Sequence, residues 1–128
     1  MNIIAETGVR HVFLRDMVLQ ASIGWYAHEH GVPQRVRINV DLAVEEDADT
    51  SDHLRRVVSY ETVAKAIRAI VAAGHVKLVE TLAERIAEVC LIDPRVRFAH
   101  VQVEKLDIFP DAAAAGVAIL RRRGDTTR

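Results

Sequence analysis

Apolar and polar residues alternate along residues 35–44, and this is the clearest strand pattern in the chain. A period of two places one set of side chains on a core and the other toward water or a partner. The inward set is Val36, Ile38, Val40, Leu42 and Val44. Residues 9–23, 96–105 and 115–123 are also rich in β-branched and apolar residues, so they predict three further strands. Arg15 and Asp16 interrupt the first of these and predict a bulge or a turn.

Two segments in the middle of the chain change to helical spacing. Residues 60–73 and 79–92 each place their apolar side chains on one stripe. Ser59 is a suitable N-cap for the first helix, and Gly74 and Pro94 predict where the two helices stop. The resulting order is strand, strand, helix, helix, strand, strand. We therefore expect an α+β fold in which two helices cover one face of a four-stranded antiparallel sheet.

The composition predicts one globular domain spanning residues 1–128. Half of the residues are hydrophobic, 27% are charged, and the net charge is −1. This balance favours neither nucleic acid nor an anionic membrane as a partner. The single cysteine, Cys90, excludes an internal disulfide and a cysteine zinc cluster, and its place in an apolar stripe predicts core packing. Without a signal peptide or a span of roughly 20 apolar residues, we expect a cytoplasmic protein.

The predicted sheet leaves two edge strands unpaired. Exposed strand edges invite association, and the face that the helices do not cover also needs water or a partner. Assembly of several sheets into a larger sheet or barrel would satisfy both requirements. We therefore expect a homo-oligomer.

Four polar residues at the ends of predicted elements are candidates for chemistry: Glu29, Tyr60, Glu80 and Lys105. Each also has an ordinary explanation, as a solvated loop acid, a ring packed at a helix start, a carboxylate favoured by the helix dipole and a lysine protecting a strand end. Lys105 can donate or accept a proton. Glu80 lies at the border of its helix's apolar stripe, where a carboxylate can hold an amide edge through two hydrogen bonds. Together the four favour an enzyme.

Other polar clusters carry less weight. The triplet His28-Glu29-His30 does not predict a metal site, because three neighbouring loop residues do not easily converge on one ion. The run Arg121-Arg122-Arg123 at the end of the last strand could bind phosphate, but an exposed basic tail is the simpler interpretation.

Several segments carry a resemblance to a known family. They are GWYAHE and Gln34 before the alternating strand, VSYETV at the first helix, LVETLAERIAE at the second, VQVEK at the third strand and GVAILR at the last. Together they resemble the dihydroneopterin aldolase family over nearly the whole chain. The resemblance implies the tunnelling fold, in which four subunits join their sheets into a β-barrel and two rings often stack into an octamer. It also implies active sites between subunits and no metal or cofactor.

The resemblance implies a retro-aldol reaction on a pterin. 7,8-Dihydroneopterin would yield 6-hydroxymethyl-7,8-dihydropterin and glycolaldehyde, a step of folate biosynthesis. Lys105, Tyr60 and Glu29 correspond to the family's catalytic residues, and Glu80 to the anchor of the amino-pyrimidine edge. The pocket lining would be Leu78 and Val79 with Val58 and Ser59, while Tyr60, Val58 and Ser59 would come from a neighbouring subunit.

Two alternatives remain open on the sequence. A 2′-epimerase acting on dihydroneopterin or its triphosphate would share the same intermediate, and a triphosphate would need a basic patch such as Arg35 and Arg37. The other alternative is a non-catalytic oligomer of the same fold that binds pterin or purine. Leu106 follows the lysine where many family members have proline, which bears on the specificity for the substrate's side chain.

Overall fold

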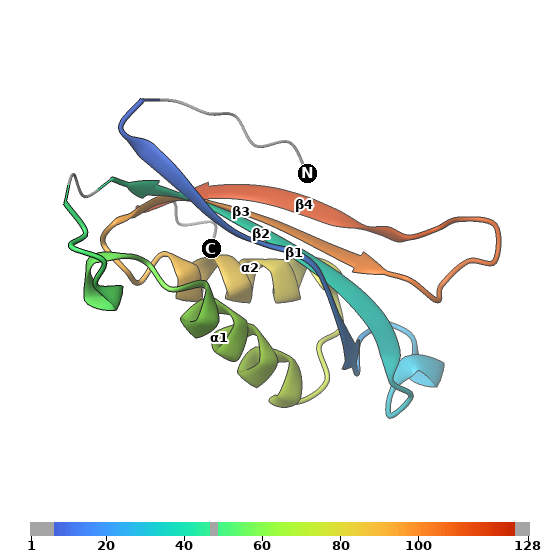
Figure 1. The fold of residues 1–128 in the computed structure, drawn as a ribbon. Coiled ribbons are helices and arrows are strands. Elements are labelled where there is room, and N and C mark those ends of the chain that lie inside the picture. Colours follow the sequence, from blue (N-terminus) through green and yellow to red (C-terminus); the bar gives the residue numbers. More distant parts are fainter. Residues whose placement is uncertain (1–6, 47–48, 125–128) are drawn as a thin grey trace.

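The computed structural model describes residues 7–46 and 49–124. Its centre is a four-stranded antiparallel sheet in the order β1-β2-β3-β4. The strands are β1 (Val9–Ala21), β2 (Gln34–Glu45), β3 (Val96–Lys105) and β4 (Ala115–Arg122). The helices α1 (Tyr60–Ala72) and α2 (Val79–Cys90) lie against one face of the sheet (Figure 1), and short 3-10 turns form η1 (Ala27–Glu29) and η2 (Leu54–Arg56). The predicted fold class is confirmed.

The main difference from the predicted boundaries lies at the end of the first strand, which we expected to reach residue 23. β1 instead ends at Ala21, because the next residues leave the sheet to pair with the connection between the helices. Val76 donates its backbone N–H to the Ser22 carbonyl at 3.1 Å, and Gly24 donates to the Val76 carbonyl at 3.0 Å. This short parallel contact ties the α1–α2 connection to the loop that follows β1.

The core lies between the sheet and the helices, as the alternation in residues 35–44 predicts. The inward residues of β2 are almost fully buried and join Ile67 of α1 and Leu82 and Ile86 of α2 in one cluster. Burying a side chain of this size stabilises the fold by about 1.5–3 kcal/mol. Cys90 belongs to the same cluster, and burial raises the pKa of its thiol to about 12, so it is an inert core residue as predicted.

The interruption in the first strand is a bulge, as predicted. The β1–β2 register shifts between Leu14 and Met17, and Asp16 adopts a left-handed φ of 58°. The buried Asn39 holds it in place, because its Oδ1 accepts from the Asp16 N–H at 2.8 Å and its Nδ2 donates to Asp16 Oδ1 at 3.2 Å. The bulge therefore has a polar partner inside the sheet.

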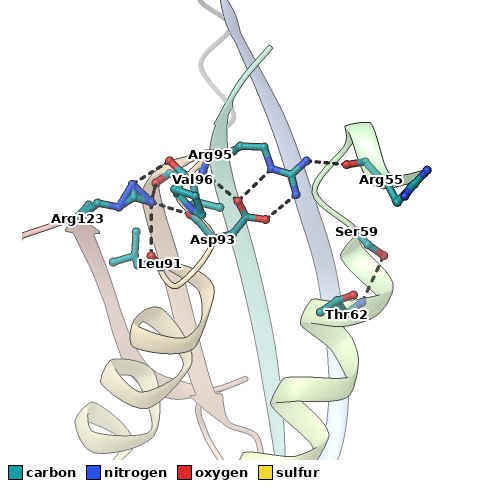
Figure 2. A network of polar contacts seen from close by, with 9 residues as sticks. Arg55, Ser59, Thr62, Leu91, Asp93, Arg95, Val96 and Arg123 are labelled. Atoms are coloured by element: carbon teal, nitrogen blue, oxygen red, sulfur yellow. Dashed lines mark hydrogen bonds and ion pairs between the residues drawn. The ribbon is translucent and has the colours of Figure 1, made fainter. Parts of the chain in front are cut away.

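Arg122 and Arg123 are exposed, as expected of a basic tail, but Arg121 is half-buried, and both Arg121 and Arg123 have partners in the fold. Arg121 forms an ion pair with Glu84 of α2. Arg123 donates to the carbonyls of Asp93, Pro94 and Val96 at 2.6–3.0 Å, in the turn between α2 and β3 (Figure 2). These two side chains fasten the last strand to the end of α2.

The same turn is linked to η2, which precedes α1. Arg95 forms an ion pair with Asp93 at 2.7 Å and donates to the Arg55 carbonyl at 3.3 Å (Figure 2). Nearby, Ser59 accepts the Thr62 N–H at 3.4 Å, which confirms it as the N-cap of α1. No helix in the described part of the chain is long and apolar enough to cross a membrane.

Candidate active site

Glu29 and Lys105 lie together at one end of the sheet. Glu29 ends the 3-10 turn between β1 and β2, and Lys105 ends β3. Their side chains are only 8% and 10% exposed, and Lys105 Nζ lies 2.6 Å from Glu29 Oε2. The contact spans 76 residues of sequence. Glu29 is therefore not a solvated loop acid, and the pair forms a buried charged contact at this end of the sheet.

Glu29 is held as a carboxylate by three donors. Besides Lys105, Gln34 donates through Nε2 to Glu29 Oε2 at 2.8 Å, and the Tyr26 N–H donates to Oε1 at 3.3 Å. The hydrogen bond from Lys105 is the largest cause that lowers the pKa of Glu29 to about 2, followed by the hydrogen bond from Gln34, although burial alone would raise that pKa. Glu29 is therefore ionised at neutral pH.

Gln34 is a residue of the site whose role the sequence did not reveal. Its Nε2 also donates to the Ile23 carbonyl at 2.7 Å, so it joins the two ends of the loop as well as holding Glu29. The available signal was its place at the first position of β2, five residues after the acid. A side chain at that position can reach both Ile23, where the loop begins, and Glu29.

Gly24 makes room for the Glu29 carboxylate. A Cβ atom at position 24 would lie 2.1–2.3 Å from the carboxylate atoms, well inside any real contact. Gly24 also has a φ of +141°, a conformation that disfavours a side chain. The chain can thus place its backbone directly against the acid.

The start of α2 lies at the same end of the sheet as the end of β3, whose last residue is Lys105 (Figure 1). Glu80 is exposed in the first turn, Leu78 is 43% exposed at the N-cap position, and Val79 is half-buried. Leu78 provides no side-chain acceptor for the first N–H groups of α2. A helix start of this kind presents backbone donors beside the Glu80 carboxylate.

Tyr60, Val58 and Ser59 lie elsewhere in the chain. Tyr60 is 64% exposed at the start of α1 and lines a narrow hollow with Val40 and Leu42. Lys105 instead pairs with Val36 on β2. At about 3.3 Å per strand residue, the two positions are roughly 13–20 Å apart along β2. One chain alone therefore does not bring Tyr60 to the Glu29–Lys105 pair.

Two clefts lie at opposite ends of the molecule. The first, of about 550 Å³, reaches Glu29 and Gln34 between the Glu29 loop and the β3–β4 loop, and Tyr26 and Phe109 line it. The second, of about 710 Å³, is lined in part by Val58 and Ser59 beside α1. Although the second cleft is larger, we choose the first as the candidate site because it is lined by Glu29 of the ionised Glu29–Lys105 pair. In residues 7–46 and 49–124, no three His, Cys, Asp or Glu side chains gather as metal ligands.

The arginines expected to receive a triphosphate both have carboxylate partners. Arg35 pairs with Asp107 at 2.7 Å, and Arg37 pairs with Glu104 at 2.9 Å. Each guanidinium donates to its carboxylate through two nitrogens, the arrangement that best satisfies such a fork. Both guanidinium groups are therefore already bound to carboxylates, although the Arg35 side chain is 53% exposed.

Comparison with known proteins connects this geometry to a family. A family model described as dihydroneopterin aldolase matches residues 12–120. A dihydroneopterin aldolase of Streptomyces coelicolor is 36% identical over 97 residues, which cover 75% of this chain and 82% of the relative. A dihydroneopterin triphosphate 2′-epimerase of Pseudomonas aeruginosa is 26% identical over 119 residues, which cover 92% of this chain and 97% of that relative.

Solved structures agree with the sequence relatives. A dihydroneopterin aldolase of Burkholderia thailendensis bound to guanine aligns with a TM-score of 0.80 and 36% identity, over 91% of this chain and 93% of that chain. The Escherichia coli dihydroneopterin aldolase in complex with neopterin aligns with a TM-score of 0.82 and 26% identity, over 88% of this chain and 98% of that chain. This chain belongs to the dihydroneopterin aldolase family.

Proposed function

We propose that this protein cleaves 7,8-dihydroneopterin into 6-hydroxymethyl-7,8-dihydropterin and glycolaldehyde. The observation that carries the proposal is the buried Glu29–Lys105 pair, at the end of the sheet where α2 begins and carries Glu80 in its first turn. A charged donor beside a carboxylate, next to an open helix start, suits a flat polar ring that carries a hydroxylated side chain.

Glu80 is the proposed anchor of the ring. Its carboxylate can accept two hydrogen bonds from an amino-pyrimidinone edge, and the first N–H groups of α2 can donate to the neighbouring carbonyl. The ligands of the two solved relatives, guanine and neopterin, share such an edge. Leu78 and Val79 would contact the ring beside the anchor.

Lys105 is the proposed acid. Cleavage breaks the C1′–C2′ bond of the side chain, and the bonding electrons move into the ring's C6=N5 group. The Lys105 ammonium can supply the proton that N5 then takes up, directly or through a water. The C2′ hydroxyl loses its proton as its carbon becomes the aldehyde of glycolaldehyde. C1′ is then protonated, and N5 gives back its proton as the C6=N5 double bond re-forms. No step of this sequence requires a metal.

Glu29 and Tyr60 are the proposed groups around the side chain. With a pKa of about 2, Glu29 is a weak base, so its role is to accept hydrogen bonds from the side-chain hydroxyls and to keep Lys105 in place. The Tyr60 phenol can then carry a proton between the C2′ hydroxyl and solvent. This role requires Tyr60, with Val58 and Ser59, to come from a neighbouring subunit.

A homo-tetramer or octamer is therefore part of the proposal. Within one chain β1 and β4 are the edge strands of the sheet, and Tyr60 lies away from Lys105. Joining the sheets of several copies through these edges would remove the open edges and would supply Tyr60 to the site. The cytoplasmic location stays a prediction.

The 2′-epimerase is the second candidate, supported by the Pseudomonas aeruginosa relative. Cleavage followed by recombination of the same two fragments would invert C2′. A triphosphate substrate is disfavoured here, because Arg35 and Arg37 are both paired with carboxylates. Epimerisation of unphosphorylated dihydroneopterin would use the same residues as cleavage.

A product assay tests the proposal. The purified protein is incubated with 7,8-dihydroneopterin, the pterins are separated by chromatography, and glycolaldehyde is measured in parallel. We expect 6-hydroxymethyl-7,8-dihydropterin and glycolaldehyde in equal amounts. A pterin isomer without glycolaldehyde would instead establish the epimerase. Binding of neopterin without any turnover would support the non-catalytic alternative.

A further inference from the structure

The side chain of His75, in the connection between α1 and α2, contacts the Glu29 loop on both sides of that acid. Its Nε2 lies 2.8 Å from the Gly24 carbonyl, and its Nδ1 lies 2.6 Å from Ser22 Oγ. Its ring also stacks on His30, with the ring centroids 3.8 Å apart and the planes at 24°. One imidazole thus contacts the chain before and after the acid.

These contacts define the proton on the ring. The Gly24 carbonyl can only accept, so Nε2 must carry a hydrogen. In the neutral ring Nδ1 is then an acceptor, and the Ser22 hydroxyl donates to it. Backbone hydrogen bonds from Gly24 to Val76 and from Val76 to Ser22 hold the same turn from the other side. The turn is therefore fixed by both side chain and backbone.

The fixed turn in turn limits where Glu29 can lie. Gly24 packs directly against the carboxylate, at a distance that leaves no space for a Cβ atom. His30 follows Glu29 immediately, and its ring rests on His75. If His75 were removed, both flanks of the acid would lose a contact, while Lys105 and Gln34 would still hold its oxygens.

We propose that His75 is a positioning residue that holds the Glu29 carboxylate against Lys105. His75 belongs to the connection that leads into the first turn of α2, so it also links the acid to the helix that carries Glu80. Its effect on turnover rests on the proposed function, whereas its effect on the loop does not. His75 itself contacts no proposed reacting atom.

The test compares two variants with a control. His75→Ala should lower kcat about 10- to 100-fold, the scale of a displaced catalytic group, while the dissociation constant for neopterin changes less than about threefold because Glu80 is untouched. His75→Gln should recover kcat to within about threefold of the wild type, because its amide can donate to the Gly24 carbonyl. His100→Ala, on the sheet face away from the helices, should behave like the wild type.

A second measurement needs no substrate. Backbone amide exchange over residues 24–30 should become faster in His75→Ala and return toward the wild-type rate in His75→Gln. Unchanged exchange in His75→Ala would overturn the inference even if the wild type proved to have no aldolase activity. A lower melting temperature with wild-type kcat per folded site would also overturn it, because His75 would then act on stability alone. If the wild type lacks activity but the exchange result holds, the proposed function fails and the positioning role stands.

Discussion

The two ends of the sheet each contain an ion pair, but the two pairs differ in kind. Asp93 and Arg95 are two residues apart, their side chains are 30% and 40% exposed, and Arg95 also donates to a carbonyl of the η2 turn. Glu29 and Lys105 come from distant segments and are almost completely buried. The first pair binds a turn to its surroundings. The second places a full positive and a full negative charge beside a cleft.

Only the buried pair requires a functional explanation. An exposed local pair costs little to form and contributes about 0–1 kcal/mol. A buried pair must recover a desolvation penalty and is often no more stable than apolar residues in its place. In both pairs the basic partner lowers the pKa of the acid, so both acids are ionised at neutral pH. Stability explains the Asp93 end, whereas the Glu29 end points to chemistry.

Lys105→Ala should produce the largest effect. Removing a positioned acid should lower kcat about 10²- to 10⁴-fold while leaving the neopterin dissociation constant within about tenfold. Steady-state kinetics and calorimetric binding would measure the two quantities. The variant also leaves Glu29 buried without its cation, so we expect a loss of stability on the order of 3 kcal/mol.

The double variant Lys105→Ala, Glu29→Gln separates the two consequences of losing Lys105. Its neutral amide should restore much of the stability, as measured by urea unfolding, without restoring turnover. Recovery of kcat in the double variant would contradict the assignment of Lys105 as the acid.

Glu80→Ala should act on binding, not on stability. Glu80 is exposed, so its loss should leave the unfolding free energy within about 0.5 kcal/mol of the wild type. Without the carboxylate the ring's donors lose their partner, and we expect neopterin affinity to fall about 100-fold or more. Glu84→Ala, one helical turn further along α2, is a control for binding alone, because Glu84 pairs with Arg121 and its loss also lowers stability. Normal neopterin binding by Glu80→Ala would show that the anchor is another group.

The response to acid should distinguish Glu29 from other carboxylates. Its pKa in the folded protein is about 2, below the ordinary value of 4.5. The stability from this difference is present above about pH 4.5 and is lost as the pH falls toward 2. Unfolding measured across this window should therefore show a smaller decline in Glu29→Gln than in the wild type. Equal slopes for the two proteins would contradict the lowered pKa.

Arg95→Ala should give the smallest effect and should change only stability. It removes a partly exposed ion pair and one hydrogen bond to the Arg55 carbonyl, so we expect a loss of about 1 kcal/mol. Thermal unfolding would measure the loss, and kcat should match that of the wild type. A marked fall in kcat would mean that this end of the sheet also takes part in the reaction.

The fold was predictable because its signals are local. The alternation in β2, the helical stripe of α2 and the Ser59 N-cap each depend on neighbours in sequence, and each is confirmed. The early end of β1 was not predictable, because it depends on a backbone contact with Val76, more than 50 residues further along the chain. The pairing of Arg121 and Arg123 with α2 and its end also arises only in three dimensions.

The site was predictable only in part. Glu29 and Lys105 could be named from the sequence, but the ordinary expectation for a loop acid is solvation, and only the folded chain shows its burial against Lys105. Gln34 offered only its place at the start of β2 and its part in the family resemblance, and His75 carries no signal that separates it from other polar loop residues. Whether Tyr60 reaches the site depends on a second copy of the chain, which no local pattern describes.

The missing side chain at Gly24 has a consequence for how this protein can evolve. While Glu29 remains, any side chain at position 24 would collide with its carboxylate. The two positions can therefore change in only one order. A mutational path that abandons the acid must first shorten or replace Glu29 and only later alter Gly24. A relative that has a larger residue at the position of Gly24 is therefore expected to have lost the acid already. The presence of glycine at position 24 therefore indicates whether a related sequence can still accommodate the Glu29–Lys105 pair.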